Sequence, residues 1–175
     1  MTPHRFATDS SLDFLARRLR FLGYDVASVR GARLEDVFET AARESRIVLT
    51  PSARHPRRFG DVPVVRVERE APERAVRAIA AAYLPASAPF HRCPECNTAL
   101  ERRTAFEAHG EVPGRVLRRV QALHYCPHCG KWYWDGSHVA RLRAWLEAAL
   151  GRPLDAGAGP GTPPDPPPPP LGPLS

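Results

Sequence analysis

Four cysteines, arranged as two identical steps, constrain this chain more than any other feature of its sequence. The steps are Cys93-Pro-Glu-Cys96 and Cys126-Pro-His-Cys129, and residues 97–125 separate them. Two thiolates three positions apart on a tight turn can grip one face of a tetrahedral ion, and a second such turn closes the other face. The pattern therefore predicts a zinc ribbon in which Cys93, Cys96, Cys126 and Cys129 bind one structural Zn²⁺.

The segment between the two cysteine pairs suits a long hairpin. Residues 98–105 and 116–125 are the candidate arms, and Val112-Pro113-Gly114 is the candidate bend. Three histidines lie close enough in sequence to be considered as ligands, although four thiolates already complete a closed structural site. These histidines are His124, His128 and His138.

Disulfides, or thiols without a metal, are the alternative interpretation of the cysteines. The first residues, Met1-Thr-Pro-His-Arg-Phe, lack the apolar segment of a secretory signal. We therefore expect a cytoplasmic protein, and in a reducing compartment a Cys-x-x-Cys pair is more often a metal site than a bridge.

Length, charge and hydropathy set outer bounds on fold and partners. With 175 residues and 43% hydrophobic content, the chain has material for one domain of about a hundred residues and a small metal-stabilised unit. No apolar run approaches the length of a membrane span, so we expect no membrane partner. The net charge of +6 favours an anionic partner, and RNA or DNA is the obvious class.

The first predicted elements lead to an acidic side chain. Residues 5–8 form a candidate strand that ends at Asp9, and Ser10 or Ser11 is the expected cap of a following helix. A stripe of leucines at helical spacing indicates that this helix ends at Gly23; the stripe consists of Leu12, Leu15, Leu19 and Leu22. The nearby arginines Arg17, Arg18 and Arg20 lie mostly off the stripe. They form either a solvated face or an edge that contacts phosphates beside Asp9.

Strands and helices alternate through the first half of the chain. We expect strands over 24–29, 46–50 and 62–67, helices over 34–44 and 72–83, and a loop over 51–59. This alternation implies right-handed crossovers and an α/β fold with a parallel sheet flanked by helices. The expected division is an α/β domain (1–84), a hinge (85–91), the zinc ribbon with a terminal helix over 138–150 (92–150), and a tail (151–175). The tail is rich in proline, so it is expected to be disordered or extended.

Three segments carry a resemblance to a known family. Residues 9–25 read Asp-Ser-Ser-Leu-Asp-Phe-Leu-Ala-Arg-Arg-Leu-Arg-Phe-Leu-Gly-Tyr-Asp, residues 46–50 read Arg-Ile-Val-Leu-Thr, and the back segment comprises 92–97, 112–113 and 126–138. Over about residues 5–150 the chain resembles the Mut-seven C-terminal RNase domain family, in which a PIN-like nuclease fold is fused to a zinc ribbon. The front segment is similar to the family's Asp-x-x-Leu-Gly-x-Leu-Ala-Arg-x-Leu-Arg-x-Leu-Gly-Phe-Asp.

The resemblance implies a site of carboxylates at the carboxyl ends of the parallel strands, holding Mg²⁺ or Mn²⁺ for RNA hydrolysis. It assigns catalytic roles to Asp9 and Asp36. The family's acid at the start of the second helix falls on Leu34, although Glu35 and Asp36 follow at once. Asp13 replaces a family glycine one helical turn after Asp9, and it is either a further ligand or a solvated first-turn acid.

A second departure from the family follows the third strand. The family's Leu-Thr-Arg-Asp ends on a metal-binding acid, whereas this chain has Leu49-Thr50-Pro51-Ser52. Serine cannot supply the missing negative charge. The acid count therefore separates a weakened metal-dependent ribonuclease from a noncatalytic nucleic-acid-binding or regulatory protein.

Two further segments have open roles. The run Trp132-Tyr133-Trp134 either stacks on bases, which makes Trp132 a candidate nucleic-acid contact, or packs the ribbon. The proline-rich segment 163–173 either docks an unknown protein partner, as in a zinc-stabilised adaptor, or is a flexible extension.

Overall fold

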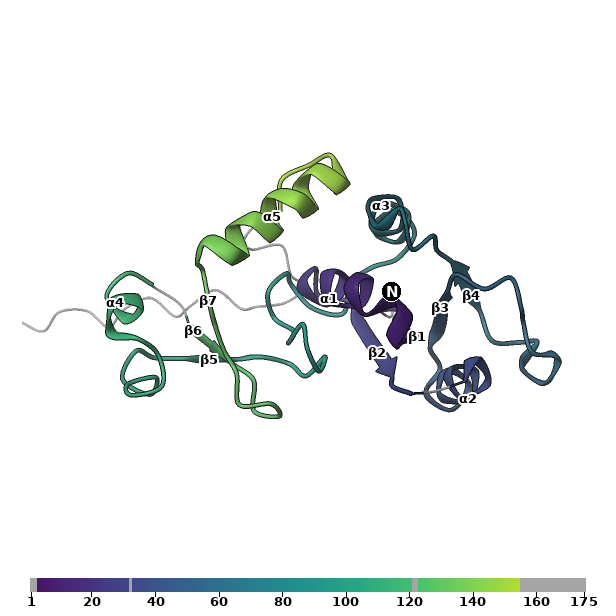
Figure 1. Cartoon of the computed structure of the whole chain (residues 1–175), viewed down its shortest axis with the longest axis horizontal. Helices are drawn as coiled ribbons and strands as arrows, with labels where there is room; N and C mark the ends of the chain where they lie inside the picture. The colour runs from purple at the N-terminus through teal and green to yellow at the C-terminus, as the bar shows by residue number, and fades with distance from the viewer. Residues whose placement is uncertain (1–2, 32, 121–122, 155–175) are drawn as a thin grey trace, which may run out of the picture.

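The first half of the chain forms a parallel sheet. In this computed structural model, residues 3–31, 33–120 and 123–154 are described. The strands are β1 (Arg5–Asp9), β2 (Asp25–Val29), β3 (Ile47–Thr50) and β4 (Val64–Arg66). They lie in the order β2-β1-β3-β4, and every neighbouring pair is parallel (Figure 1). The predicted α/β fold with a parallel sheet is confirmed.

Helices cover both faces of this sheet because the strand side chains alternate. On one face, Phe6 of β1 packs with α1 (Asp13–Phe21) and α3 (Pro72–Ala82). On the other face, Ala7 of β1 and Val48 of β3 pack with Phe38 of α2 (Leu34–Glu44). Successive strand residues point to opposite faces, so each buried strand supplies both layers.

The start of α1 differs from its prediction. Neither Ser10 nor Ser11 caps the helix; instead a 3-10 turn, η1 (Ser10–Leu12), follows the strand, and the carboxylate of Asp9 accepts a hydrogen bond from the Ser11 backbone N–H at 2.7 Å. A carboxylate at this position satisfies an otherwise unpaired N–H, as N-cap residues do.

The terminal helix α5 (Ser137–Leu150) returns to the α/β core. Leu146 and Ala149 are buried in the same cluster as Phe6, and α5 packs beside α3. The side chain of Arg77 on α3 donates a hydrogen bond to the Ala149 carbonyl at 2.8 Å. The helix that we predicted as part of the ribbon region therefore lies on the α/β unit (Figure 1).

The ribbon is a three-stranded antiparallel sheet of β5 (Glu101–Arg103), β6 (Leu123–Tyr125) and β7 (Trp132–Trp134). The predicted arm over 116–125 is wrong in its first part, because the short helix α4 (Gly114–Leu117) packs the partly buried Val116 and Leu117 against the ribbon's own apolar cluster. The third strand, β7, was not predicted as a strand.

The C-terminal tail lies largely beyond the described residues. The prediction of a disordered or extended tail concerns 151–175, of which 155–175 fall outside the described part of the chain. Within the described ranges, no helix has both the length and the apolar character to cross a membrane.

Candidate metal centre and acidic edge

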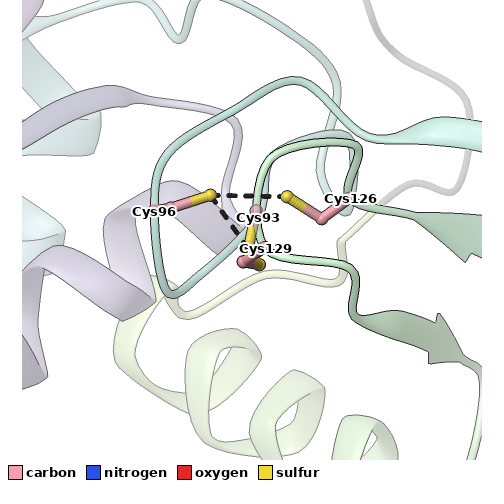
Figure 2. Close-up of side chains that lie close together, drawn as sticks. All are labelled: Cys93, Cys96, Cys126 and Cys129. Atoms are coloured by element: carbon pink, nitrogen blue, oxygen red, sulfur yellow. Dashed lines mark hydrogen bonds between the residues drawn. The ribbon is translucent and has the colours of Figure 1, made fainter.

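The four cysteines meet at one point between the two Cys-Pro-x-Cys turns, which we call the knuckles. Their sulfur atoms all lie within 4.8 Å of one another, with Cys96 to Cys126 at 3.4 Å and Cys93 to Cys129 at 3.6 Å (Figure 2). Sulfurs bound tetrahedrally at about 2.3 Å from Zn²⁺ lie about 3.8 Å apart, whereas disulfide sulfurs lie at about 2 Å. The four thiols are free. The arrangement therefore fits a single four-coordinate metal and not a pair of disulfides.

The two knuckles have the same backbone construction. The N–H of Cys93 donates to the Thr98 carbonyl at 2.8 Å, and the N–H of Cys126 donates to the Lys131 carbonyl at 2.9 Å. The residue after the second cysteine is left-handed in both knuckles, with φ of 70° at Asn97 and 67° at Gly130. Asparagine and glycine are the residues that adopt this conformation at least cost.

Thiol ionisation differs among the cysteines. Burial raises the pKa of Cys96, but its hydrogen bonds with Thr98 and with neighbouring cysteines outweigh burial and lower that pKa to about 6. Burial raises the pKa of Cys126 to about 12. A bound divalent cation would deprotonate every coordinating thiol.

Histidines do not join this group. Within the described ranges, the cluster of candidate metal ligands contains cysteines alone, so His124, His128 and His138 lie outside it. His124 is half-buried, and burial lowers its pKa; its ring lies edge-on to that of His91, with centroids 6.0 Å apart. Four thiols are a sufficient ligand set.

The first knuckle is bonded directly to the edge strand β2. The Asn97 side chain accepts a hydrogen bond from the Val26 N–H at 3.1 Å and donates one to Asp25 at 2.8 Å. Asp25 in turn accepts a 2.6 Å bond from the buried guanidinium of Arg46. Sequence reasoning missed these three roles, although Asp25, Arg46 and Asn97 all lie in the segments that carry the family resemblance.

Arg20 also takes part in the contact between the first cysteine knuckle and β2. Its guanidinium is buried and donates to the Val26 carbonyl at 2.8 Å, the Pro94 carbonyl at 2.8 Å and the Ser28 hydroxyl at 2.8 Å. The predicted nucleic-acid contact for Arg20 does not fit this position, because these donors are already used inside the protein. Arg17 remains half exposed and pairs with Glu95 at 3.0 Å.

Asp9 lies at the carboxyl end of the central strand β1. The neighbouring strand β3 is parallel and in register, with Ala7 beside Val48, so both strands end at the same edge of the sheet. One oxygen of the Asp9 carboxylate accepts the Ser11 N–H. In the described part of the chain, however, Asp9 is not part of any cluster of three candidate ligands.

Asp36 is committed to its own helix. Its carboxylate accepts the Arg33 N–H at 2.8 Å, which forms one half of a capping box at the start of α2. Leu34 packs with the apolar cluster beneath α2, and Glu35 lies 3.8 Å from Arg54 in an ion pair. The predicted catalytic pair, Asp9 and Asp36, therefore stays a prediction.

Ser52 follows β3 at the same edge. Its hydroxyl accepts the Arg54 N–H at 3.0 Å, and it lines an open depression with two carboxylates that sequence reasoning did not single out, Glu68 and Glu70. Their position just after the end of β4 was the available signal, since acids that follow parallel strands share one edge. The residues that the structure describes do not form the complete acidic site that the resemblance implies.

Trp132 faces the interior of the ribbon. Trp132 and Trp134 pack against Leu123 and Val112, while the hydroxyl of Tyr133, on the opposite face of β7, lies 3.1 Å from the Cys93 sulfur. The indole N–H of Trp132 donates to Glu111 at 2.9 Å. These contacts favour the packing interpretation, and base stacking by Trp132 remains a prediction.

The sequence was compared with models of known protein families. The model of the Mut7-C RNAse domain matches residues 4–146. Searches of curated proteins and of solved structures returned no match. Because the matched range spans the sheet, both cysteine knuckles and most of α5, the chain belongs to the Mut7-C RNAse domain family.

Proposed function

We propose that this chain acts on RNA as a member of the RNase family whose acidic site is depleted, with a PIN-like fold and a cytoplasmic location. The family match over residues 4–146 carries the proposal, since it joins a nuclease-like domain to the cysteine ribbon. The net charge of +6 supports an anionic partner.

Zn²⁺ is the metal we assign to the four cysteines. A soft, closed set of four thiolates is typical of structural zinc, which needs no open coordination position. Cys93 and Cys126 are buried, and four thiolates leave no coordination position for a substrate. Zinc then stabilises the ribbon and takes no part in hydrolysis.

RNA cleavage by this protein is expected to be slow and to require added Mn²⁺ or Mg²⁺. Hard divalent cations need several oxygen ligands, and each absent carboxylate weakens their retention. Of the two acids assigned by resemblance, Asp9 and Asp36, the second already caps α2. In addition, Ser52 stands where the family has a further acid. Asp9 is therefore the residue on which any activity depends.

Cleavage of a labelled single-stranded RNA over a Mn²⁺ titration tests this proposal. We expect weak activity in the wild type, none in Asp9→Asn, and higher turnover at lower Mn²⁺ in Ser52→Asp. Asp61→Asn, an exposed acid on the loop before β4, is the matched control and is expected to leave the rate unchanged. Activity that survives Asp9→Asn would remove the assigned site.

A noncatalytic RNA-binding role is the second candidate. It is favoured because Asp36 caps its own helix and a neutral hydroxyl, that of Ser52, stands where the family has an acid, which leaves fewer carboxylates to hold a cation. RNA binding with no cleavage in the wild type, Asp9→Asn or Ser52→Asp would establish this candidate over the first.

A further inference from the structure

Three exposed arginines gather on a single helical turn at the end of the ribbon. Arg115 lies in α4, Arg118 caps it, and Arg119 continues the turn through its N–H bond to the Val116 carbonyl at 2.8 Å. Side chains at spacings of three and four lie on one face of a helix. The opposite face is formed by Val116, Leu117 and Val120, which pack on the ribbon core, so the arginines are held outward.

These arginines have no acidic partner in the described ranges. The structure gives no ion pair to Arg115, Arg118 or Arg119 from residues 3–31, 33–120 or 123–154, whereas many other arginines, such as Arg46 and Arg103, are paired. Residues 121 and 122, which follow the turn in the sequence, are glutamine and alanine and carry no charge. Among the described residues, the turn therefore presents three uncompensated positive charges.

The carboxylates of the same β5–β6 connection are occupied elsewhere. Glu107 accepts hydrogen bonds from the Thr104 N–H at 2.8 Å and from Arg103 at 2.9 Å, and the Thr104 backbone bond is the largest cause that lowers the pKa of Glu107 to about 2. Glu111 accepts the Trp132 indole N–H. Neither acid is placed to neutralise the arginine turn.

An exposed aromatic ring belongs to this connection as well. Phe106 is 89% exposed, the largest exposure among the large hydrophobic side chains of the described chain. It lies in the turn that Thr104 and Glu107 close, between β5 and α4. The segment from β5 to α4 is at the end of the molecule opposite β4 (Figure 1). A rigidly held turn that exposes a phenyl ring presents a stacking surface at little entropic cost.

We propose that the surface formed by Arg115, Arg118, Arg119 and Phe106 binds single-stranded RNA, with the guanidinium groups on phosphates and the phenyl ring under a base. Arginine suits phosphate because its planar fork donates two parallel hydrogen bonds. Aromatic rings beside cationic side chains are the usual components of single-strand binding surfaces. This inference rests on the proposed RNA function and gives the substrate a contact at the far end of the ribbon from Asp9.

RNA affinity at several salt concentrations tests the surface. A fluorescent oligouridine is titrated, without added divalent cation, into zinc-loaded wild type, into the triple variant Arg115→Gln, Arg118→Gln, Arg119→Gln, and into Phe106→Ala. The triple variant is expected to bind more weakly and to reduce the slope of log affinity against log salt by about 2, since each phosphate contact on a single strand contributes about 0.7. Phe106→Ala is expected to weaken binding by roughly tenfold with an unchanged slope.

A charge-matched variant controls for net charge. Arg43→Gln, Arg141→Gln and Arg152→Gln remove three exposed arginines, one in α2, one in α5 and one two residues after α5. This variant is expected to keep most of the wild-type slope. Circular dichroism and zinc content verify folding of each protein. Equal slopes in the two triple variants would overturn the inference, and so would competition by polyglutamate as effective as that by RNA.

The outcomes separate this inference from the proposed function. If cleavage requires Asp9 but both triple variants bind RNA with equal affinity, the proposed function stands and the arginine surface is ruled out. Binding that depends on the arginine turn in a protein that cleaves nothing retains the surface on a noncatalytic scaffold. A wild type that binds no RNA contradicts both.

Discussion

At the scale of single residues, Asp25 joins the sheet to the first cysteine knuckle. Its carboxylate accepts bonds from Arg46 at 2.6 Å and from Asn97 at 2.8 Å, and Arg92 lies 3.7 Å away. Arg46 is buried, and its charge is compensated by two acidic partners, Asp25 at 2.6 Å and Glu44 at 2.7 Å. Removing one member of a buried pair leaves the other uncompensated, and this costs more than the pair itself contributes.

Asp25→Asn is expected to lower the free energy of unfolding at neutral pH by about 3 kcal/mol, measured by urea denaturation. Burial raises the pKa of Asp25, but the hydrogen bonds from Arg46 and Asn97 and the charges of Arg46 and Arg92 outweigh burial, and the net pKa is lowered. The stabilisation is therefore complete above the unfolded-state pKa of about 3.9 and is lost as the pH falls through the lower folded-state value. Asp61→Asn is the exposed control; an identical acid dependence in the Asp25→Asn and wild-type proteins would contradict this role.

Residue spacing predicted the metal ligands, but it could not predict Arg20. The cysteines are identified by local geometry, since each pair sits on one short turn. Arg20 lies off the leucine stripe of α1 and was interpreted as solvent-exposed or phosphate-binding. It is buried because the knuckle around Pro94 docks on β2 and offers backbone carbonyls to it. That docking joins segments far apart in sequence, which helical periodicity does not report.

At the scale of elements, periodicity predicted the α/β half well. The helix predicted over 34–44 is α2 with the same bounds, and the strands over 24–29, 46–50 and 62–67 contain β2, β3 and β4. The ribbon was harder, because its strands have three residues each and its order depends on the metal ligands more than on a hydrophobic pattern. The placement of α5 on α3 is again a long-range contact.

Gly23 fixes the segment that connects α3 to the ribbon. Its carbonyl accepts the N–H groups of Ala86 at 3.0 Å and Ser87 at 3.1 Å, and its φ is +92°. A Cβ atom on residue 23 would lie 1.9 Å from the Ser87 carbonyl oxygen. The backbone of the predicted hinge therefore packs against this residue directly, and only glycine fits.

Gly23→Ala is expected to destabilise the protein by more than Gly31→Ala, measured by thermal or urea unfolding. Gly31 also has positive φ, +62°, but nothing lies within 4 Å of an added Cβ, so its substitution carries only the backbone strain of about 1 kcal/mol. Gly23→Ala adds a backbone collision that separates residues 86–88 from α1. Equal losses in the two variants would show that the segment over 85–91 is not held against Gly23.

At the scale of the whole molecule, hydrogen bonds join the ribbon to the parallel sheet. Asn97, next to the ligand Cys96, supplies the acceptor for the Val26 N–H on the edge strand β2. Edge strands carry unpaired backbone groups, and here a side chain of the knuckle satisfies one of them. Metal binding at the cysteines should therefore stabilise the edge strand β2 of the sheet.

Zinc removal is expected to expose β2 before the centre of the sheet. Elemental analysis should find one zinc per chain, and binding in small zinc peptides contributes roughly 10 to 16 kcal/mol. After chelation, or in Cys93→Ser, the Val26 amide should exchange hydrogen faster, while the Val48 amide, which donates to the Pro63 carbonyl in the sheet interior, should change less. Unchanged exchange at Val26 in a zinc-free protein would disprove this coupling.

The most direct measurement of the central claim, a depleted acidic site dependent on Asp9, is Mn²⁺-induced broadening of backbone amide NMR signals in the zinc-loaded protein. A paramagnetic ion broadens nearby amides whether or not the protein cleaves RNA. We expect weak broadening of the Ser10 and Ser11 amides at high Mn²⁺, loss of this broadening in Asp9→Asn, and broadening at lower Mn²⁺ in Ser52→Asp. Broadening that is unchanged in Asp9→Asn, or confined to another surface, would contradict it.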